Sequence, residues 1–122
     1  MARFLFSALV LAILLPGTAS ADNLTDKEIA GELAGKEIAW WEQEGWRHGH
    51  LFLSPDGVAE MTVDRPVAER DTGRWSLRGD AVCTRWNRLR DGHEKCYRIQ
   101  RDERGLFLTS GGNVFEVREL GV

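Results

Sequence analysis

A pair of histidines is the pattern in this chain with the most specific chemistry. His48 and His50 are two residues apart, and Trp46 and Phe52 continue the same alternation on either side. Side chains at this spacing in a strand point to one face, with Cα atoms about 6.6 Å apart, so both imidazoles reach a single metal ion. No third ligand stands at a defined spacing, and exposed polar strand residues explain such a pair more often. His48 and His50 are therefore a candidate metal site, and the sequence indicates no cofactor.

Aromatic residues form a second candidate site. The chain has five tryptophans, and Trp40, Trp41 and Trp46 lie within one short segment. Flat aromatic surfaces at the mouth of a small barrel suit a sugar, a lipid or another apolar ligand. The alternative is that tryptophans fill the barrel interior. Adjacent side chains of a strand point to opposite faces, so Trp40 and Trp41 cannot both be interior, and all three tryptophans are candidate ligand-binding residues.

Charge is unevenly distributed along the chain. Residues 22–73 are mainly acidic and residues 74–104 mainly basic, within a formal net charge of −3. A basic strand surface containing Arg74 and Arg85 would bind an acidic partner. Alternatively, such arginines pair with acidic neighbours and keep sheet edges soluble. Nucleic acid is not an expected partner, because the whole chain is acidic and contains no recognisable nucleic-acid-binding module.

Catalytic signatures are absent from the sequence. The serines, Ser110 among them, lack the context of a nucleophile elbow, and the three histidines follow no catalytic motif. Gly111-Gly112-Asn113 is typical of a hairpin turn rather than of a phosphate-binding loop. The sequence therefore favours a protein that is not an enzyme. A hydrolase whose site is assembled only in space is an alternative.

The N-terminal segment, residues 1–21, has the features of a secretory signal peptide. Arg3 supplies a positive charge, residues 4–15 are an apolar run, and Ala19-Ser20-Ala21 is an A-x-A cleavage site. No later apolar run approaches the roughly 20 residues that span a bilayer, so no retained membrane span is expected. We expect a periplasmic or secreted protein with one folded domain, residues 22–122.

Two cysteines, Cys83 and Cys96, are the only ones in the chain. Disulfides persist in secreted and periplasmic proteins, so we expect these two to be bonded to each other. Their spacing is not that of a CxxC pair, which argues for a structural rather than a redox role.

Capping signals and side-chain periodicity divide the folded part into one helix and several strands. Thr25 and Glu28 form a capping box for a helix over residues 26–34, which Gly35 ends. From residue 36 onward, alternating apolar residues and glycine-bearing turns predict strands. The predicted strands are 36–41, 46–54, 58–63, 72–78, 81–86, 94–100, 105–110 and 114–119.

Connections this short join antiparallel neighbours, and sequential antiparallel strands expose both sheet edges unless the sheet curls. The composition, 43% hydrophobic and 29% charged, is that of a globular domain. We therefore predict a mainly β fold, an antiparallel up-and-down barrel or half-barrel of seven to eight strands with one short N-terminal helix. A disulfide across the hairpin fixes its register, with Val82 opposite Tyr97 and Arg85 opposite Glu94. By the same alternation, Trp75 faces the core.

A set of short motifs runs through most of the folded part. The segments are Leu33-Ala34-Gly35-Lys36, Leu53-Ser54-Pro55-Asp56-Gly57, Thr72-Gly73-Arg74-Trp75, Gly79-Asp80-Ala81-Val82-Cys83, Trp86 and Cys96-Tyr97. Together they resemble a family of small secreted proteobacterial proteins annotated only as domains of unknown function. The resemblance implies a β-rich periplasmic fold and carries no activity with it.

The chain is also similar to periplasmic lysozyme inhibitors, which are small barrels with a stabilising disulfide. These proteins insert a loop with Ser and Lys into the lysozyme cleft. Ser110-Gly111 is the comparable loop here, and the last lysine of the chain, Lys95, lies far from it in sequence. An acidic net charge favours a cationic enzyme as partner.

These observations together predict a non-enzymatic secreted or periplasmic binding protein. Its partner is a small ligand or an envelope protein. A periplasmic lysozyme inhibitor and a hydrolase with an unrecognised site are the alternatives.

Overall fold

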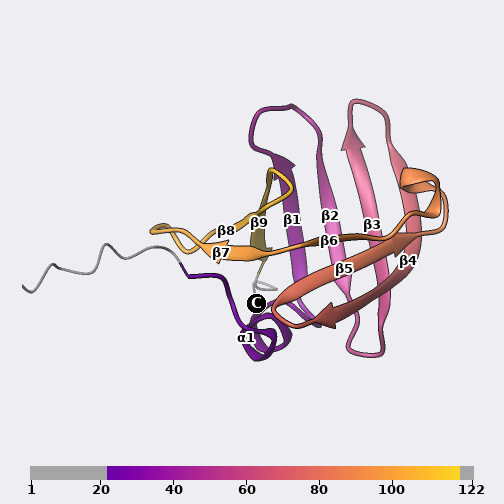
Figure 1. Ribbon diagram of the computed structural model, residues 1–122. Helices are drawn as coiled ribbons and strands as arrows, with labels where there is room; N and C mark the ends of the chain where they lie inside the picture. The colour runs from indigo at the N-terminus through magenta and orange to yellow at the C-terminus, as the bar shows by residue number, and fades with distance from the viewer. Residues whose placement is uncertain (1–21, 119–122) are drawn as a thin grey trace, which may run out of the picture.

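A single antiparallel sheet and one short α-helix make up the structure, a computed structural model that describes residues 22–118. The elements are α1 (Asp26–Glu32), β1 (Glu37–Glu42), β2 (His48–Leu53), β3 (Val58–Arg65), β4 (Glu69–Arg78), β5 (Ala81–Trp86), the 3-10 turn η1 (Leu89–Gly92), β6 (Lys95–Tyr97), β7 (Ile99–Arg101), β8 (Phe107–Thr109) and β9 (Asn113–Arg118). The strand order is β6-β5-β4-β3-β2-β1-β9-β8-β7, and the sheet curls into a nearly closed barrel (Figure 1). The predicted mainly β barrel is confirmed. The predicted signal peptide, residues 1–21, lies outside the described residues.

One continuous stretch of chain closes the barrel. β6 pairs with β5 and β7 pairs with β8, at opposite edges of the sheet, although only Arg98 separates β6 from β7. The N–H of Arg98 donates to the hydroxyl of Ser110, and its carbonyl oxygen accepts from the N–H of Ser110. The strand predicted at 94–100 is therefore two strands, because the chain changes partner at Arg98. This change brings together the two edges that an open sheet would expose.

Three other strands, β2, β4 and β8, begin two or three residues from their predicted starts, and the structure explains the first two. β2 begins at His48 rather than at residue 46, because the N–H of Glu42 donates to the carbonyl of Arg47 and closes a turn that contains Trp46. β4 begins at Glu69 rather than at residue 72, since it continues to pair with the long strand β3.

The helix α1 closes one end of the barrel (Figure 1). As predicted, Thr25 and Glu28 form a capping box, in which each side chain accepts a hydrogen bond from the other residue's N–H. The helix ends two residues before its predicted end, with Leu33 as C-cap, and Gly35 turns the chain toward β1 at a φ of 74°. Ile29 and Leu33 are fully buried, so the helix acts as an apolar plug.

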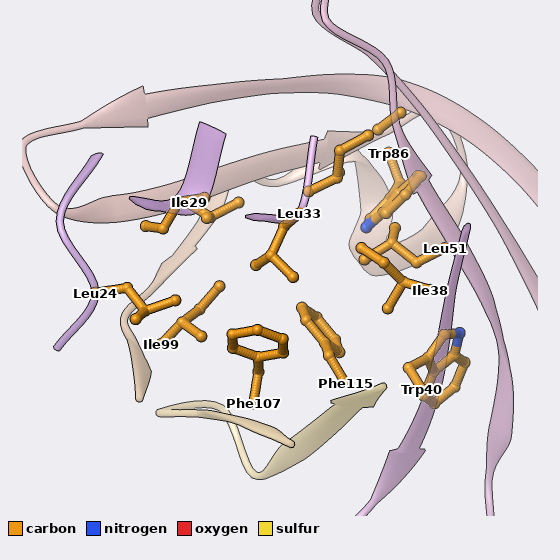
Figure 2. Packing of buried hydrophobic residues seen from close by; sticks show 13 residues of the cluster. Leu24, Ile29, Leu33, Ile38, Trp40, Leu51, Trp86, Ile99, Phe107 and Phe115 are labelled. Atoms are coloured by element: carbon orange, nitrogen blue, oxygen red, sulfur yellow. The ribbon is translucent and has the colours of Figure 1, made fainter. Parts of the chain in front are cut away.

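The hydrophobic core fills the barrel next to this plug (Figure 2). Phe107 and Phe115 are opposite each other in β8 and β9, and their rings lie side by side below Leu33 in Figure 2. Trp75 faces inward as predicted, and its indole N–H donates to the carbonyl of Ser54 over 2.7 Å. The fully buried side chains at the helical end are Ile29, Leu33, Ile38, Leu53, Val82 and Ile99.

The predicted disulfide and its register are confirmed. Cys83 and Cys96 are bonded across β5 and β6, and Val82 lies opposite Tyr97. The predicted Arg85–Glu94 pair is wrong: the β5–β6 ladder stops at Lys95, and the carboxylate of Glu94 binds the guanidinium of Arg78 on β4 at 2.7 Å.

A glycine lets one tryptophan cross a neighbouring strand. Gly49 on β2 lies opposite Trp40 on β1, next to a register shift between β2 and β3. The indole N–H of Trp40 reaches past it and donates to the carbonyl of Thr62 on β3 over 3.1 Å. A Cβ on Gly49 would overlap that carbonyl oxygen and lie 3.0 Å from Trp40 Nε1. Trp40 therefore keeps its inward position only beside glycine.

Two glycine-to-alanine substitutions separate this steric requirement from the general effect of losing a glycine. Gly49→Ala should lower the free energy of unfolding by about 2 kcal/mol or more, because the added methyl forces β2 and β3 apart. Gly31→Ala, in the exposed part of α1 with no atom within 4 Å of the new Cβ, should raise it by about 0.5–1 kcal/mol. Urea unfolding measures both, and equal effects of the two substitutions would contradict the account of Trp40.

Candidate functional site

A cavity of about 490 Å³ opens at the barrel end opposite α1. Its mouth is formed by the connections between β1 and β2, β3 and β4, and β8 and β9, together with η1. The first two of these connections and η1 lie at the upper end in Figure 1, away from α1. The size falls within the range of pockets that take small organic ligands. The helix at one end and the cavity at the other give the barrel the shape of a cup.

Aromatic and aliphatic side chains form the inner wall of the cavity. Trp40 and Trp86 are buried at its inner end, and Tyr97 contacts Phe115 edge to face, with ring centroids 6.1 Å apart. The remaining apolar side chains that line it are Leu51, Met61, Val63, Pro66, Val67 and Leu89. Such walls gain free energy by covering an apolar ligand.

Positive charge gathers at one side of the cavity. Lys95 is half-buried on β6, opposite the buried Thr84, and a Cβ on Gly111 would lie only 3.3 Å from Lys95 Nζ. Burial and the positive charge of Arg90 both lower the pKa of the Lys95 ammonium. Arg90 on η1 also lines the cavity. Two cationic side chains thus stand beside the aromatic wall.

Tyr97 adds a polar group to the apolar wall. Burial raises the pKa of its hydroxyl well above the ordinary value, and the charge of Arg90 offsets only part of that rise. The hydroxyl is therefore protonated at every physiological pH and can donate a hydrogen bond to a ligand.

A buried carboxylate holds η1 at the mouth. Asp71 on β4 is 5% exposed, and its carboxylate accepts from the N–H groups of Arg88, Leu89 and Thr72 at 2.9–3.0 Å. Burial alone would raise the pKa of this carboxyl, but the three backbone donors outweigh burial and hold the pKa below its ordinary value. The ionised carboxylate fixes the segment that carries Arg90.

The backbone of η1 itself is in a conformation that side chains disfavour. Arg90 and Asp91 have φ of 55° and 53°, in the left-handed region that non-glycine residues seldom occupy. Each such residue costs about 1 kcal/mol or more unless its surroundings impose it. The bonds to Asp71, and the His93 N–H donating to the carbonyl of Arg90, impose it here.

The three candidate tryptophans do not share one surface. Trp40 lines the cavity, whereas Trp41 is half-buried on the outer face of β1. Trp46 lies in the β1–β2 turn with 77% of its surface exposed, outside the strand face on which the sequence placed it with the histidines. Only Trp40 of this group belongs to the cavity.

The candidate metal ligands lie on the outside of the barrel. His48 and His50 alternate with buried residues of β2, and both are exposed as their spacing predicts. Nε2 of His50 lies 3.2 Å from the carboxylate of Asp64, which also accepts a hydrogen bond from Thr62. Among residues 22–118, the one group of three candidate metal-binding side chains contains the bonded Cys83 and Cys96, not these histidines.

Arg74 and Arg85 are directly opposite each other on the outer faces of β4 and β5. Both are exposed. Two other arginines of the basic segment are paired with carboxylates: Arg78 binds Glu94 and Arg101 binds Glu32.

Trp86, Lys95 and Tyr97 are among the lining residues that the sequence did not indicate as parts of a binding site. The predicted disulfide register places Tyr97 opposite Val82, and strand alternation puts Trp86 on the same face as Val82. Extending the same register by two residues puts Lys95 inside as well. A lysine on the inner face of a barrel strand was the signal that a cavity, not only packing, lay there.

Comparison of the chain with protein-family models, with curated proteins and with solved structures finds no match. Within the part of the chain that the structure describes, no helix is long and apolar enough to cross a membrane.

Replacing the buried carboxylate tests its role in holding η1. Asp71→Asn should lower the free energy of unfolding by about 2 kcal/mol at neutral pH, because hydrogen bonds to a charged group contribute about 1.5–3 kcal/mol. The folded-state pKa of Asp71 is depressed, so this contribution is present above the ordinary carboxyl pKa of about 4 and is lost as pH falls through the lowered value. Urea unfolding of both proteins at neutral and acidic pH measures the difference.

The matched control is Glu60→Gln, which removes a carboxylate from an exposed position on β3. It should change stability by no more than about 0.5 kcal/mol. If Asp71→Asn were as harmless as this control at neutral pH, the anchoring role would be refuted.

Proposed function

We propose that the chain is a non-enzymatic binding protein that holds a small ligand in the open end of its barrel. The observation that carries the proposal is the cavity of about 490 Å³ lined by Trp40, Trp86, Tyr97 and Phe115. A core that needed only stability would gain from filling this volume. A few polar groups on an otherwise apolar wall are the usual composition of a ligand site.

We place this function in the periplasm or outside the cell. The Cys83–Cys96 disulfide supports an oxidising compartment, and the A-x-A pattern at residues 19–21 supports export. The ligand would then be a molecule of the cell envelope or of the medium.

Binding of the neutral fluorescent probe N-phenyl-naphthylamine tests the proposal. Its fluorescence should rise when it enters the wild-type cavity, because the probe leaves water for an apolar wall. Met61→Trp places a larger side chain in the cavity wall and should weaken binding by about tenfold or more. Val63→Phe is the second filling variant if Met61→Trp melts far below the wild type.

The control variant is Trp46→Ala, which removes the exposed tryptophan of the β1–β2 turn. Probe binding should be unchanged in it. Loss of binding in Trp46→Ala, with full binding in the two filling variants, would place the ligand outside the barrel and overturn the proposal.

A lysozyme inhibitor is the second candidate, and one observation favours it. Lys95, distant from Ser110 in sequence, lies beside Gly111, the residue that follows Ser110. If this candidate holds, equimolar protein should slow lysis of bacterial cell walls by lysozyme, and Lys95→Met should relieve the inhibition. Unchanged lysis at a several-fold excess of protein would exclude it.

A further inference from the structure

Lys95 is a half-buried lysine in the lining of the cavity. It lies opposite Thr84 on the inner side of the β5–β6 ladder, two residues from the inward-facing Tyr97. Lysine side chains are mostly exposed to solvent, whereas Lys95 is half-buried on the inner wall. Within residues 22–118, no carboxylate oxygen lies within 4.0 Å of Lys95 Nζ.

The carboxylates at the mouth do not supply the missing partner. Glu42 accepts from the backbone N–H of Arg47 at 3.1 Å, and its carboxylate lies 4.0 Å from that residue's guanidinium. Glu69, the other acidic side chain of the lining, forms no ion pair with Lys95 or with Arg90 in the part of the chain that the structure describes. Within the described residues 22–118, neither the half-buried Lys95 nor the exposed Arg90 forms an ion pair with a carboxylate.

Arg90 is the second of these cations, and its position is imposed by the fold. The left-handed backbone of Arg90 and Asp91 is held by the buried carboxylate of Asp71. Backbone conformations of this kind cluster at active sites, ligand clamps and switch regions. Arg90, Lys95 and Tyr97 all line the same cavity.

We infer that the cavity binds a small amphipathic anion, with its anionic head between Lys95 and Arg90 and its apolar body against Trp40, Trp86 and Phe115. This inference rests on the proposed function and specifies its ligand class. A guanidinium and an ammonium together match the two oxygens of a carboxylate. The protonated hydroxyl of Tyr97 supplies a third donor to the same head group.

Competition between probes that share one alkyl chain tests the assignment. Decanoate, decanol and decyltrimethylammonium differ in head-group charge, and each is titrated against the wild-type chain loaded with N-phenyl-naphthylamine. Decanoate should displace the probe at a concentration about tenfold or more below that of decanol, because hydrogen bonds to a charged partner are the stronger ones. The alkylammonium should be the weakest competitor.

Two variants test whether the preference for decanoate over decanol arises in the cavity. Lys95→Met keeps the length of the side chain and removes its charge, so the advantage of decanoate over decanol should fall about tenfold while decanol binds as before. Arg85→Gln removes an exposed arginine from the outer face of β5 and should leave the advantage intact.

Equal displacement by decanoate and decanol in the wild type would overturn the anion site and leave the apolar cavity in place. A preference for decanoate that survives Lys95→Met but disappears in Arg85→Gln would also overturn it. Failure of the neutral probe to bind would overturn the proposed function, and this inference with it.

Discussion

The barrel depends on one segment of chain that serves both edges of its sheet. β6 completes the ladder on β5 and β7 completes the ladder on β8, and the chain passes from one to the other at Arg98. The Cys83–Cys96 disulfide ties this segment to β5, and the hydrogen bonds between Arg98 and Ser110 tie it to the β8–β9 connection. Without this double pairing the sheet would remain open. The barrel would then have no interior for α1 to close and no cavity at its other end.

Closure divides the interior into two ends with different chemistry. At the helical end, the aliphatic side chains of Ile29 and Leu33 belong to the same hydrophobic core cluster as Phe107. At the other end the same strands carry larger and more polar side chains, and their packing leaves the cavity. The hydrophobic core cluster extends from α1 to the inner end of the cavity, so the half-buried Lys95 stands above a core that is already packed.

Most of the fold followed from local physical rules, and most of the site did not. Thr25 and Glu28 marked the helix start because capping chemistry is local, and the disulfide set the register of its hairpin because strand alternation is strict. The change of partner at Arg98 was hidden, since no local pattern shows where a continuous strand leaves one neighbour for another. The cavity was hidden for a related reason. Whether an inward Trp86 or Tyr97 fills space or lines it depends on the curvature of the whole barrel, which no single strand encodes.

The central claim is that a ligand enters the barrel rather than binding the aromatic residues outside it. The indole N–H signals of the five tryptophans in a ¹⁵N-labelled chain report on both places at once. During titration with decanol, the signals of Trp40 and Trp86 should shift together, while those of Trp46, exposed in the β1–β2 turn, and Trp75, bonded to Ser54 at the helical end, should stay in place. Shifts confined to Trp41 and Trp46, with Trp40 and Trp86 unmoved, would contradict the account.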